Sequence, residues 1–586
     1  MKPQYTIGEL LTFIEENYSN PKALVSYEHE SWHAYSTEQM LEEIKYIALG
    51  LKSLGIEKGT FVGLIAPSSA RWTMIDLAIM SIGAVSVGLF LNVSEENFRY
   101  EVELAEIKTI FVEGSDAWLR HDHCKDHFNL TIALDDEPQG EKTITYQALL
   151  ARGRELYDVE PDLFKSLLQS HTPDTVAAVI FTSGSTGTPK GAVHTHQSLI
   201  SLFYNDSLQW DSKNDIYLSI LPLAHILARS VSFIMVMWGI SIYYYNDLKN
   251  LGVACREVHP TVMVVVPRLL EKVYSKMVAN VEAAGYLKRT IGEWAFDLAN
   301  QETETTWKHL FHGLADKLVY SHLREALGGK LRLVISGGAA LDPHLNHFLG
   351  DIGIAINEGW GLTEACPVCV NPIGKTKLGS IGTLVEGMEI MISPIGEILI
   401  RGPLVMKEYL KNPEATAQAI DAEGWLHTGD KGTIDEEGYA FIIGRLKELI
   451  KTSNGEMIAP VPIEHALTKA PFIETAIIIA ERRKFVSALL VPNFEYLHGL
   501  KNNKNMSNLS DEDFLNSSYI KSEMEQLLNK MNQTLNHWEQ IHAYRFIMHP
   551  LSIENGELTP SMKIIRETIE KNYKSLIDSI YQEEKK

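Results

Sequence analysis

Cysteine is scarce in this sequence, with four residues in a chain of 586. So few cysteines cannot build the dense disulfide framework of small secreted proteins, and a reducing cytoplasm is the simplest compartment. Cys366 and Cys369 have the spacing of half a zinc site, but no second CxxC pair completes a tetrahedral set. Three histidines and a cysteine within residues 121–127 form an equally incomplete pattern. For both stretches we favour chance spacing over a metal site.

Long apolar runs and positive charge are also lacking. The first twenty residues contain no uninterrupted apolar segment, so we expect no secretory signal. The two most apolar stretches are Met74–Leu91 and Ile226–Tyr245. Each contains a charged residue, Asp76 or Arg229, which favours a buried helix and strand over a membrane span. The formal net charge of -22 argues against a duplex nucleic acid partner, because binding a phosphate backbone needs a basic face.

The sequence does have the length and composition for more than one hydrophobic core. Helix-like and strand-like patterns alternate through roughly the first 350 residues, which predicts α/β layers with largely parallel sheets. Examples are a helix over Ser36–Leu54, a strand over Thr60–Ile65, a helix over Arg71–Ile82 and a strand over Val85–Leu89. From Gly379 onward, short β-rich runs at Glu397–Arg401 and Tyr439–Ile443 predict a small antiparallel sheet or barrel.

The short charged segment Arg445–Ser453 predicts a domain boundary. Beyond it, two strands are expected over Thr475–Ala480 and Ser487–Val491. The polar stretch Asn502–Ser518 is typical of a loop. An apolar stripe from Met524 to Ile541 predicts a helix that packs on the core.

The most distinctive stretch is FTSGSTGTPKG, from Phe181 to Gly191, which follows a strand-like run. Its glycines allow backbone N–H groups to converge on an anion, and its hydroxyls and Lys190 add donors and charge. It is not a Walker loop, since Pro189 precedes the lysine and a glycine, not serine or threonine, follows it. The composition therefore favours phosphate binding over a plain flexible turn.

The spacing of TSGSTGTPKG resembles the signature of the AMP-forming acyl-CoA synthetases, within the adenylate-forming superfamily that also holds peptide-synthetase adenylation domains and beetle luciferases. Further motifs follow in the order of that family. Leu221-Pro-Leu-Ala-His225 matches a motif whose histidine lies near the acyl carboxylate, although this motif taken alone would favour a core histidine. The stretch TVMVVVPR, Thr261–Arg268, resembles a strand and turn of the long-chain members, which favours long-chain acids over acetate.

Later motifs match the nucleotide-binding elements of the family. SGGAA, Ser336–Ala340, resembles the loop beside adenosine, and EGWGLTE, Glu358–Glu364, resembles the adenine-stacking motif with tryptophan in place of the usual tyrosine. WLHTGD, Trp425–Asp430, ends in a carboxylate that suits a ribose diol. GRLKELIK, Gly444–Lys451, resembles the hinge, and LTPSMK, Leu558–Lys563, resembles the motif that carries the adenylation lysine.

The resemblance implies specific roles for residues of this chain. Lys563, His225, Thr186 and Glu364 are the expected catalytic residues, with Thr186 and Glu364 holding Mg²⁺. The expected ATP- and AMP-binding residues are Thr182, Ser183, Gly184, Ser185, Thr186, Gly187, Lys190, Gly338, Ala339, Glu358, Gly359, Trp360, Gly361, Thr363, Asp430, Arg445, Lys447 and Lys451.

The resemblance also implies the fold. We expect an AMP-binding domain over residues 1–444, made of two α/β subdomains and a small β-barrel-like subdomain, then a hinge over 445–453 and a mobile α+β domain over 454–586. The sequence departs from the long-chain pattern where Ala228 replaces the usual glutamate and where Glu408 and Asn454 replace common glycines. None of these changes removes an expected catalytic group, but the loop changes could alter the acyl or coenzyme A preference.

The implied activity is that of a long-chain fatty acid–CoA ligase. A fatty carboxylate reacts with ATP to give acyl-AMP and pyrophosphate, and the thiol of coenzyme A then displaces AMP. Ser230–Tyr245 would form one wall of an acyl tunnel, or would simply be core. Alternatives that remain open are an acyl-AMP ligase or acyl-carrier-protein synthetase, a luciferase-type oxygenase, and, least favoured, a non-catalytic acyl or nucleotide sensor. We expect a cytoplasmic protein, with peripheral membrane contact left open and an oligomeric state that the sequence does not reveal.

Overall fold

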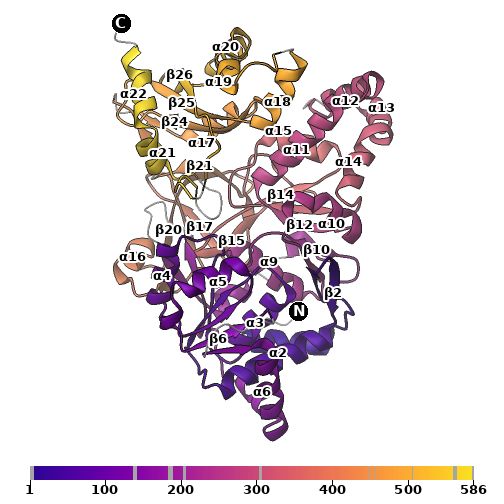
Figure 1. Cartoon of the computed structure of the whole chain (residues 1–586), viewed down its shortest axis with the longest axis vertical. Coiled ribbons are helices and arrows are strands. Elements are labelled where there is room, and N and C mark those ends of the chain that lie inside the picture. The colour runs from indigo at the N-terminus through magenta and orange to yellow at the C-terminus, as the bar shows by residue number, and fades with distance from the viewer. Residues whose placement is uncertain are drawn as a thin grey trace. The chain divides into compact units, whose positions relative to one another are not determined.

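The computed structural model describes residues 6–135, 142–182, 189–201, 206–301, 306–446, 448–453, 456–504, 506–552, 554–558 and 564–583 (Figure 1). The chain divides into two compact units. The larger unit comprises Met1–Ser393, Leu399–Thr428 and Ile434–Phe441, and the smaller comprises Pro394–Ile398, Gly429–Thr433 and Ile442–Lys586. The expected mixed α/β class, with a large N-terminal part and a smaller C-terminal part, is confirmed.

An eight-stranded sheet forms one half of the larger unit. Its strands are β3 (Phe61–Ile65), β4 (Val85–Gly88), β5 (Thr109–Val112), β6 (Leu130–Ala133), β7 (Thr143–Thr145), β8 (Val176–Thr182), β9 (Lys190–Thr195) and β19 (Glu408–Tyr409), in the order β19-β9-β8-β4-β3-β5-β6-β7. The strands from β8 to β7 in that order are parallel, whereas β9 and β19 are antiparallel additions at one edge. Most strand residues are buried, as expected of a parallel sheet covered on both faces.

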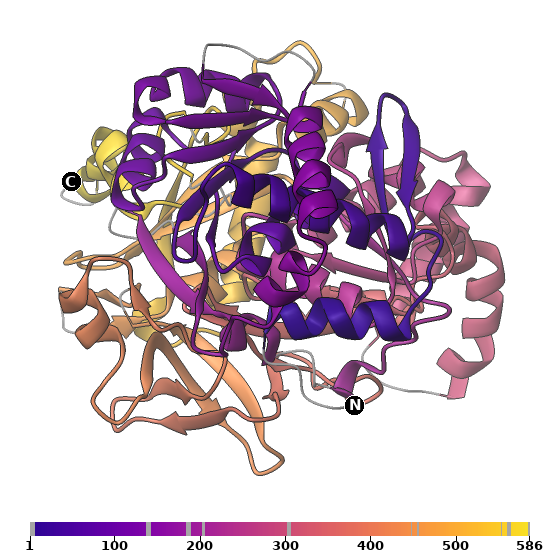
Figure 2. The ribbon, with the colours of Figure 1, turned by 90° about the horizontal axis from the view of Figure 1, so that it is seen from below.

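Helices cover this sheet, and they appear in indigo and purple in Figure 2. They are α1 (Ile7–Asn17), α2 (Thr37–Ser53), α3 (Ala70–Ser81), α4 (Glu95–Leu104), α5 (Ser115–Asp122), α6 (Tyr146–Val159), α7 (Leu163–Leu168) and α8 (His196–Ile200). A capping box between Ser36 and Gln39 starts α2 at the expected place. Every residue of α3 from Trp72 to Ser81 is buried, so Met74–Leu91 is a buried helix and strand, as predicted.

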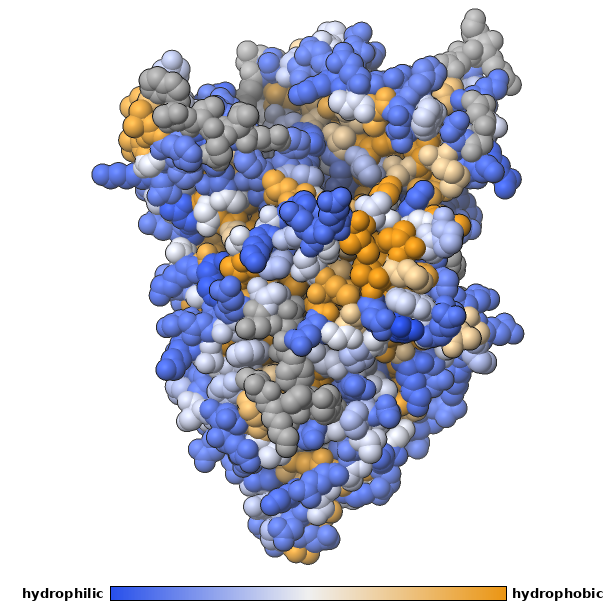
Figure 3. Space-filling model, turned by 180° about the vertical axis from the view of Figure 1, so that it is seen from behind, coloured by the Kyte–Doolittle hydropathy of each residue, from blue (hydrophilic) through white to orange (hydrophobic). Residues whose placement is uncertain are grey.

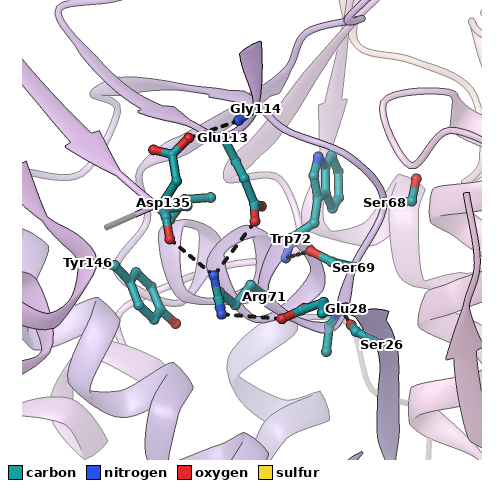
Figure 4. A network of polar contacts seen from close by, with 12 residues as sticks. Ser26, Glu28, Ser68, Ser69, Arg71, Trp72, Glu113, Gly114, Asp135 and Tyr146 are labelled. Carbon is teal, nitrogen blue, oxygen red and sulfur yellow. Dashed lines mark hydrogen bonds and ion pairs between the residues drawn. The ribbon is translucent and has the colours of Figure 1, made fainter. Parts of the chain in front are cut away.

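A charged cluster lies where β3, β5 and β6 end (Figure 4). Arg71, in the first turn of α3, approaches Glu28 at 3.4 Å and Glu113 at 3.7 Å. The same guanidinium donates to the carbonyl of Leu134 at 3.1 Å. Burial raises the pKa of Glu113 to about 7 despite the nearby arginine. The cluster ties α3 to the segments that follow the neighbouring strands.

A longer sheet of thirteen strands begins in the larger unit. Its strands are β1 (Leu24–Glu28), β2 (Ser31–Tyr35), β10 (Ile216–Ser219), β11 (Ser241–Tyr244), β12 (Val262–Val265), β13 (Leu333–Ser336), β14 (Ile356–Leu362), β15 (Ala365–Val370), β16 (Gly382–Leu384), β17 (Glu389–Ile392), β18 (Glu397–Arg401), β20 (Leu426–Ile434) and β21 (Tyr439–Arg445), in the order β17-β18-β20-β21-β16-β15-β14-β13-β12-β10-β11-β1-β2. The strands from β14 to β1 are parallel, and pairing becomes antiparallel from β14 to β15 onward. The predicted β-rich texture after Gly379 is this antiparallel part.

The helices associated with the parallel part are α9 (Ile226–Met237), α10 (Leu251–Val258), α11 (Pro267–Glu282), α12 (Tyr286–Ala299), α13 (Thr306–Ala315), α14 (Ser321–Ala326) and α15 (Pro343–Asp351), with α16 (Pro413–Ala419) after β19. All residues of α9 except Leu227 are buried, and Arg229 is among them. Met263, Phe296 and Phe348 belong to the core that packs α11, α12 and α15 on the sheet. The second apolar stretch is therefore also a buried helix and strand, as expected.

The smaller unit is an α+β structure. Its strands are β22 (Ile450–Lys451), β23 (Met457–Ile458), β24 (Ile473–Ile479), β25 (Val486–Pro492) and β26 (Ile541–Phe546), and its helices are α17 (Pro460–Leu467), α18 (Phe494–Asn503), α19 (Asp511–Leu515), α20 (Ser518–Asn532), α21 (Arg566–Asn572) and α22 (Lys574–Glu583). Along β24, Ala476 and Ile478 face the core that contains residues of α17 to α20, whereas Ile477 and Ile479 face α21 and α22. This alternation places helices on both faces of the sheet β24-β25-β26.

Two expectations in this unit are wrong. The stretch expected as a loop, Asn502–Ser518, contains α19, which starts where Ser510 caps the backbone N–H of Asp513. The helix predicted through Ile541 ends at Asn532. The side chain of Asn532 donates to the carbonyl of Ile541 and accepts from its N–H, both at 2.9 Å, so the chain turns back and Ile541 begins β26.

Residues of the two incomplete metal patterns, Cys366 and His121, make hydrogen bonds within the protein. Cys366 and Cys369 lie three residues apart on β15, so their side chains point to opposite faces of the sheet. Cys366 donates to the carbonyl of Ser198, and His121 lies 2.9 Å from the hydroxyl of Thr131. No helix within the described ranges is long and apolar enough to cross a membrane.

Candidate nucleotide-binding site

The expected phosphate loop joins two antiparallel strands. Thr182 ends β8 and Lys190 begins β9, and their Cα atoms are partners in the register. The residues between them that carry most of the expected phosphate contacts, Ser183, Gly184, Ser185, Thr186 and Gly187, lie outside the described residues. The described residues show that the strand before this segment pairs with a strand after it, whereas a Walker loop is followed by a helix.

Three expected motifs follow parallel strands of the longer sheet. Leu221–His225 follows β10, Val266–Arg268 follows β12, and Gly337–Ala340 follows β13. Because β10, β12 and β13 are parallel, these segments lie at one edge of the sheet, where ligands bind in open α/β folds. His225 is the N-cap of α9, and its Nδ1 atom accepts from the N–H of Leu227 at 3.2 Å. It is half-buried rather than a core histidine.

The adenosine loop and the adenine motif lie on neighbouring strands. Ser336, at the end of β13, pairs with Glu358 on β14, so Gly338 and Ala339 lie beside the stretch that continues through Gly359 to Gly361. Gly338 and Ala339 are exposed, and Gly338 has a φ of +83°, a conformation that glycine adopts without strain.

The adenine motif itself is tightly packed. A Cβ on Gly361 would lie 2.7 Å from the carbonyl oxygen of Cys366, so only glycine allows the two strands to approach this closely. Trp360 is 8% exposed. The Nδ2 atom of Asn346 donates to Oε1 of Glu358 at 3.1 Å, and burial raises the pKa of Glu358 to about 6.

Thr363 and Glu364 form the turn between β14 and β15, and each is held by a residue that the sequence analysis did not identify. His194 on β9 donates from Nε2 to the carbonyl of Thr363 at 2.8 Å. Burial lowers the pKa of His194 to about 4, so its ring is neutral near pH 7. Tyr409 on β19 donates its hydroxyl to Oε1 of Glu364 at 2.6 Å. Neither partner is close in sequence to the turn, so the motif Glu358–Glu364 could not predict that His194 and Tyr409 contact it.

The expected ribose contacts lie in the smaller unit. Asp430 is 2% exposed, and the Nε atom of Arg445 lies 2.9 Å from its Oδ1 atom. The arginine side chain is itself half exposed. Lys451 is exposed on β22, whereas Lys447 and Lys563 lie outside the described residues. The residues on either side of the Lys563 segment, Leu558 and Ile564, form an antiparallel bridge.

Family models match most of this chain and identify its family. The family model for AMP-binding enzymes matches residues 14–410, and the model for the C-terminal domain of AMP-binding enzymes matches residues 447–585. The chain belongs to the AMP-binding enzyme family. The resemblance carried by the ordered motifs is thereby confirmed.

This AMP-binding enzyme has curated relatives across nearly its whole length. It is 31% identical to the long-chain-fatty-acid–CoA ligase FadD15 of Mycobacterium bovis, over 94% of this chain and 93% of that protein. It is 29% identical to the long-chain-fatty-acid–CoA ligase ACSBG2 of Xenopus laevis, over 99% of this chain and 84% of that protein. Among solved structures, the adenylation domain of a carboxylate reductase from Mycobacterium chelonae superposes with a TM-score of 0.76, at 20% identity, covering 99% of this chain and 92% of that one. At that identity the structural match supports the fold alone.

Proposed function

We propose that this protein is a long-chain fatty acid–CoA ligase that works through an acyl-adenylate. The observation that carries the proposal is the whole-length similarity to two proteins named as long-chain-fatty-acid–CoA ligases. The positions that the motifs assign to the site are consistent with it. The parallel strands bring His225, Gly338 and Trp360 to one edge of a sheet, and Glu364 lies in the turn that follows.

In the first step a fatty carboxylate oxygen attacks the α-phosphorus of ATP, and the bond to pyrophosphate breaks. Both reactants are anions, so the site must neutralise charge and align the reacting atoms rather than supply a nucleophile. Residues 183–188 and Lys190 would hold the leaving pyrophosphate, and Trp360 would stack on adenine. Asp430 would accept hydrogen bonds from the ribose hydroxyls. Lys563 would stabilise charge on the carboxylate and the α-phosphate.

The donor atoms present fit a magnesium ion. Mg²⁺ prefers oxygen ligands, and Glu364 and Thr186 offer a carboxylate and a hydroxyl. The carboxylate of Glu364 is already oriented by the hydroxyl of Tyr409. When bound, the ion would neutralise negative charge on the phosphate oxygens.

In the second step the sulfur of coenzyme A attacks the acyl carbonyl, and the bond to AMP breaks. The thiol needs a path that Lys563 would otherwise obstruct. We propose that a domain over residues 454–586 rotates about the hinge 445–453, relative to an AMP-binding domain over 1–444. Arg445, the first residue of that hinge, forms an ion pair with Asp430.

The acyl chain would run along the segment Ser230–Tyr245. Most of this segment belongs to α9 and β11, and α9 is capped by His225, the residue expected near the acyl carboxylate. The apolar side chains Phe233 and Ile234 lie farther along the same helix. Most side chains of α9 are apolar, although Arg229, Ser230 and Ser232 lie on the same helix. An apolar wall of this kind suits a long hydrocarbon.

Peripheral contact with a membrane is proposed at α12, α13 and the helical turn Asp316–Tyr320 that follows α13. Leu310, Leu314 and Leu318 are spaced by four residues, so they lie along one side of the helical segment, and each is at least 45% exposed. Leu287 at the start of α12 is 72% exposed. In Figure 1, α12 and α13 lie at the upper right. Figure 3 shows the molecule from behind, so these helices lie at the upper left, where an apolar area is visible. Flotation with phosphatidylcholine vesicles should therefore be lost when Leu310 and Leu314 are both replaced by serine.

Product analysis tests the thiol acceptor and the acyl preference. Acids from C2 to C20 are offered with ATP, first with coenzyme A and then with acyl carrier protein in its place. We expect thioester only with coenzyme A and a maximum among the long chains. Thioester only on the carrier protein would make the protein an acyl-carrier-protein synthetase, and accumulation of acyl-AMP with neither thiol would make it an acyl-AMP ligase. Activity confined to C2–C4 acids would overturn the long-chain assignment.

A further inference from the structure

A short segment of the larger unit links two parts of the candidate site. We call residues Val405–Leu410 the strap. On one side, the N–H of Met406 donates to the carbonyl of Glu364 at 2.7 Å, and Val405 bridges Ala365. On the other side, the strap pairs with β9, through N–H groups of Lys407 and Leu410 that donate to Val193 and Gly191, both at 2.8 Å. The strap is thus bonded to the turn that carries Glu364 and to the strand that begins with Lys190.

Tyr409 is the strap residue whose side chain meets both of these site residues. Its hydroxyl donates to Oε1 of Glu364 at 2.6 Å. The Nζ atom of Lys190 lies 4.9 Å from the centre of its ring, which is within the range of a cation–π contact. The side chain is 7% exposed, and its backbone N–H donates to the hydroxyl of Thr416 at 2.9 Å. The tyrosine is therefore held firmly by its own surroundings.

These two contacts have different physical consequences. A hydrogen bond from a phenol to a carboxylate is charge-assisted, and it restricts the rotation of the carboxylate group. The aromatic face holds the lysine ammonium at the start of β9 without neutralising its charge. Tyr409 can therefore orient one anionic and one cationic side chain without being part of the reaction itself.

We propose that Tyr409 is a positioning residue that orients Glu364 toward the metal ion and Lys190 toward the phosphates of ATP. The inference rests on the proposed function, because it assumes that the site binds ATP with Mg²⁺. The neighbouring Glu408 does not disturb this arrangement. Glu408 is exposed on the opposite side of β19 from Tyr409, and its φ is not positive, so it leaves the tyrosine in place.

Calorimetric titration of the full-length protein with ATP tests this role without relying on catalysis. The dissociation constant of ATP is measured in Mg²⁺ and in EDTA. The ratio of the value in EDTA to the value in Mg²⁺ reports how strongly the metal supports ATP binding. In Tyr409→Phe, which keeps the ring, we expect this ratio to fall roughly tenfold, with little change in EDTA. In Tyr409→Leu, which loses the ring as well, binding in EDTA should also weaken.

Two further variants separate positioning from general damage. Tyr320→Phe removes a buried phenol that donates at 2.6 Å to the carbonyl of Ala295, and it should leave the ratio at the wild-type value. In a Glu364→Gln background, Tyr409→Phe should have no further effect on the ratio, because the carboxylate that it orients is gone. A wild type that binds no ATP in either buffer would overturn the proposed function. Wild-type binding with an unchanged ratio in Tyr409→Phe, or full additivity with Glu364→Gln, would overturn only the role of Tyr409.

Discussion

Arg229 and Asp76 form an ion pair in the interior of the larger unit. The Nε atom of Arg229 lies 2.8 Å from Oδ2 of Asp76, and neither side chain is exposed to solvent. The hydroxyl of Ser86 donates to the same carboxylate at 2.5 Å, and the guanidinium lies 5.5 Å from the ring of Trp72. The pair connects α9, whose N-cap is His225, to α3, which covers the eight-stranded sheet. The single charged residue in each apolar stretch is therefore neutralised by the charged residue of the other stretch.

Asp76→Ala should destabilise the larger unit strongly, by about 3–5 kcal/mol, because it leaves the buried charge of Arg229 without its partner. Urea unfolding followed by tryptophan fluorescence measures the loss. Glu293→Ala breaks an exposed ion pair with Arg289 in the same unit and should cost far less. The double variant Asp76→Leu with Arg229→Met should recover much of the loss. Equal costs for Asp76→Ala and Glu293→Ala would contradict the importance of the buried pair.

The buried His194 makes the stability of the larger unit depend on pH. Its pKa in the folded protein is lowered by burial to about 4, whereas the ordinary value is 6.5. The unfolded chain therefore binds the proton more readily, so the stabilisation is complete above pH 6.5 and is lost progressively as the pH falls toward 4. In His194→Gln, the decline of the unfolding free energy over this pH window should be smaller by about 3 kcal/mol. An identical decline in wild type and variant would show that His194 is protonated without cost.

Trp360 should bind adenine through its ring and not through a polar group. Trp360→Ala should weaken AMP binding by roughly 1–3 kcal/mol, because a stacking surface is lost. Trp360→Tyr, which keeps an aromatic stacking face, should bind AMP almost as well as wild type. Titration with AMP measures both variants. Weaker binding by the tyrosine variant than by the alanine variant would argue against stacking.

Lys563 should be needed for one half-reaction only. Lys563→Ala should lower the rate of adenylation by roughly two to three orders of magnitude, since one contact to the developing charge is lost. The same variant should still form thioester from supplied acyl-AMP and coenzyme A. Lys571→Ala, which removes an exposed lysine from the nearby α21, serves as the matched control and should be active in both assays. Equal loss of both half-reactions in Lys563→Ala would contradict the assigned role.

The pattern of apolar residues predicted strands and helices well where buried residues alternate with exposed ones or form a continuous run. The run Glu397–Arg401 is a strand with the predicted bounds, and Thr60–Ile65 differs from β3 by one residue at its start. The prediction of a helix that reaches Ile541 was wrong. The helix ends at Asn532, whose side chain hydrogen-bonds to the backbone of Ile541 after the chain has reversed direction. An apolar stripe carries no information about a hydrogen bond that a single polar side chain will make.

The candidate site was predictable where its residues form contiguous motifs. The motifs nominated Glu364 and Asp430, whose roles stay predictions, but gave no indication that Tyr409 and His194 contact the turn after β14. Tyr409 meets Glu364 across 45 residues, and His194 meets Thr363 across 169. Such partners are set by strand pairing between β9, β19 and the turn after β14, which only the tertiary structure provides. Contiguous motifs can nominate candidate site residues, whereas the side chains that contact them from distant strands become visible only in the fold.

Exchange of labelled pyrophosphate into ATP, measured as a function of added carboxylic acid, tests the central claim most directly. The exchange reports reversible formation of acyl-AMP and does not depend on the thiol acceptor. We predict exchange with Mg²⁺ and long-chain fatty acids, and none without acid. Absence of exchange with every carboxylic acid tested, from a folded protein that binds ATP, would contradict the account.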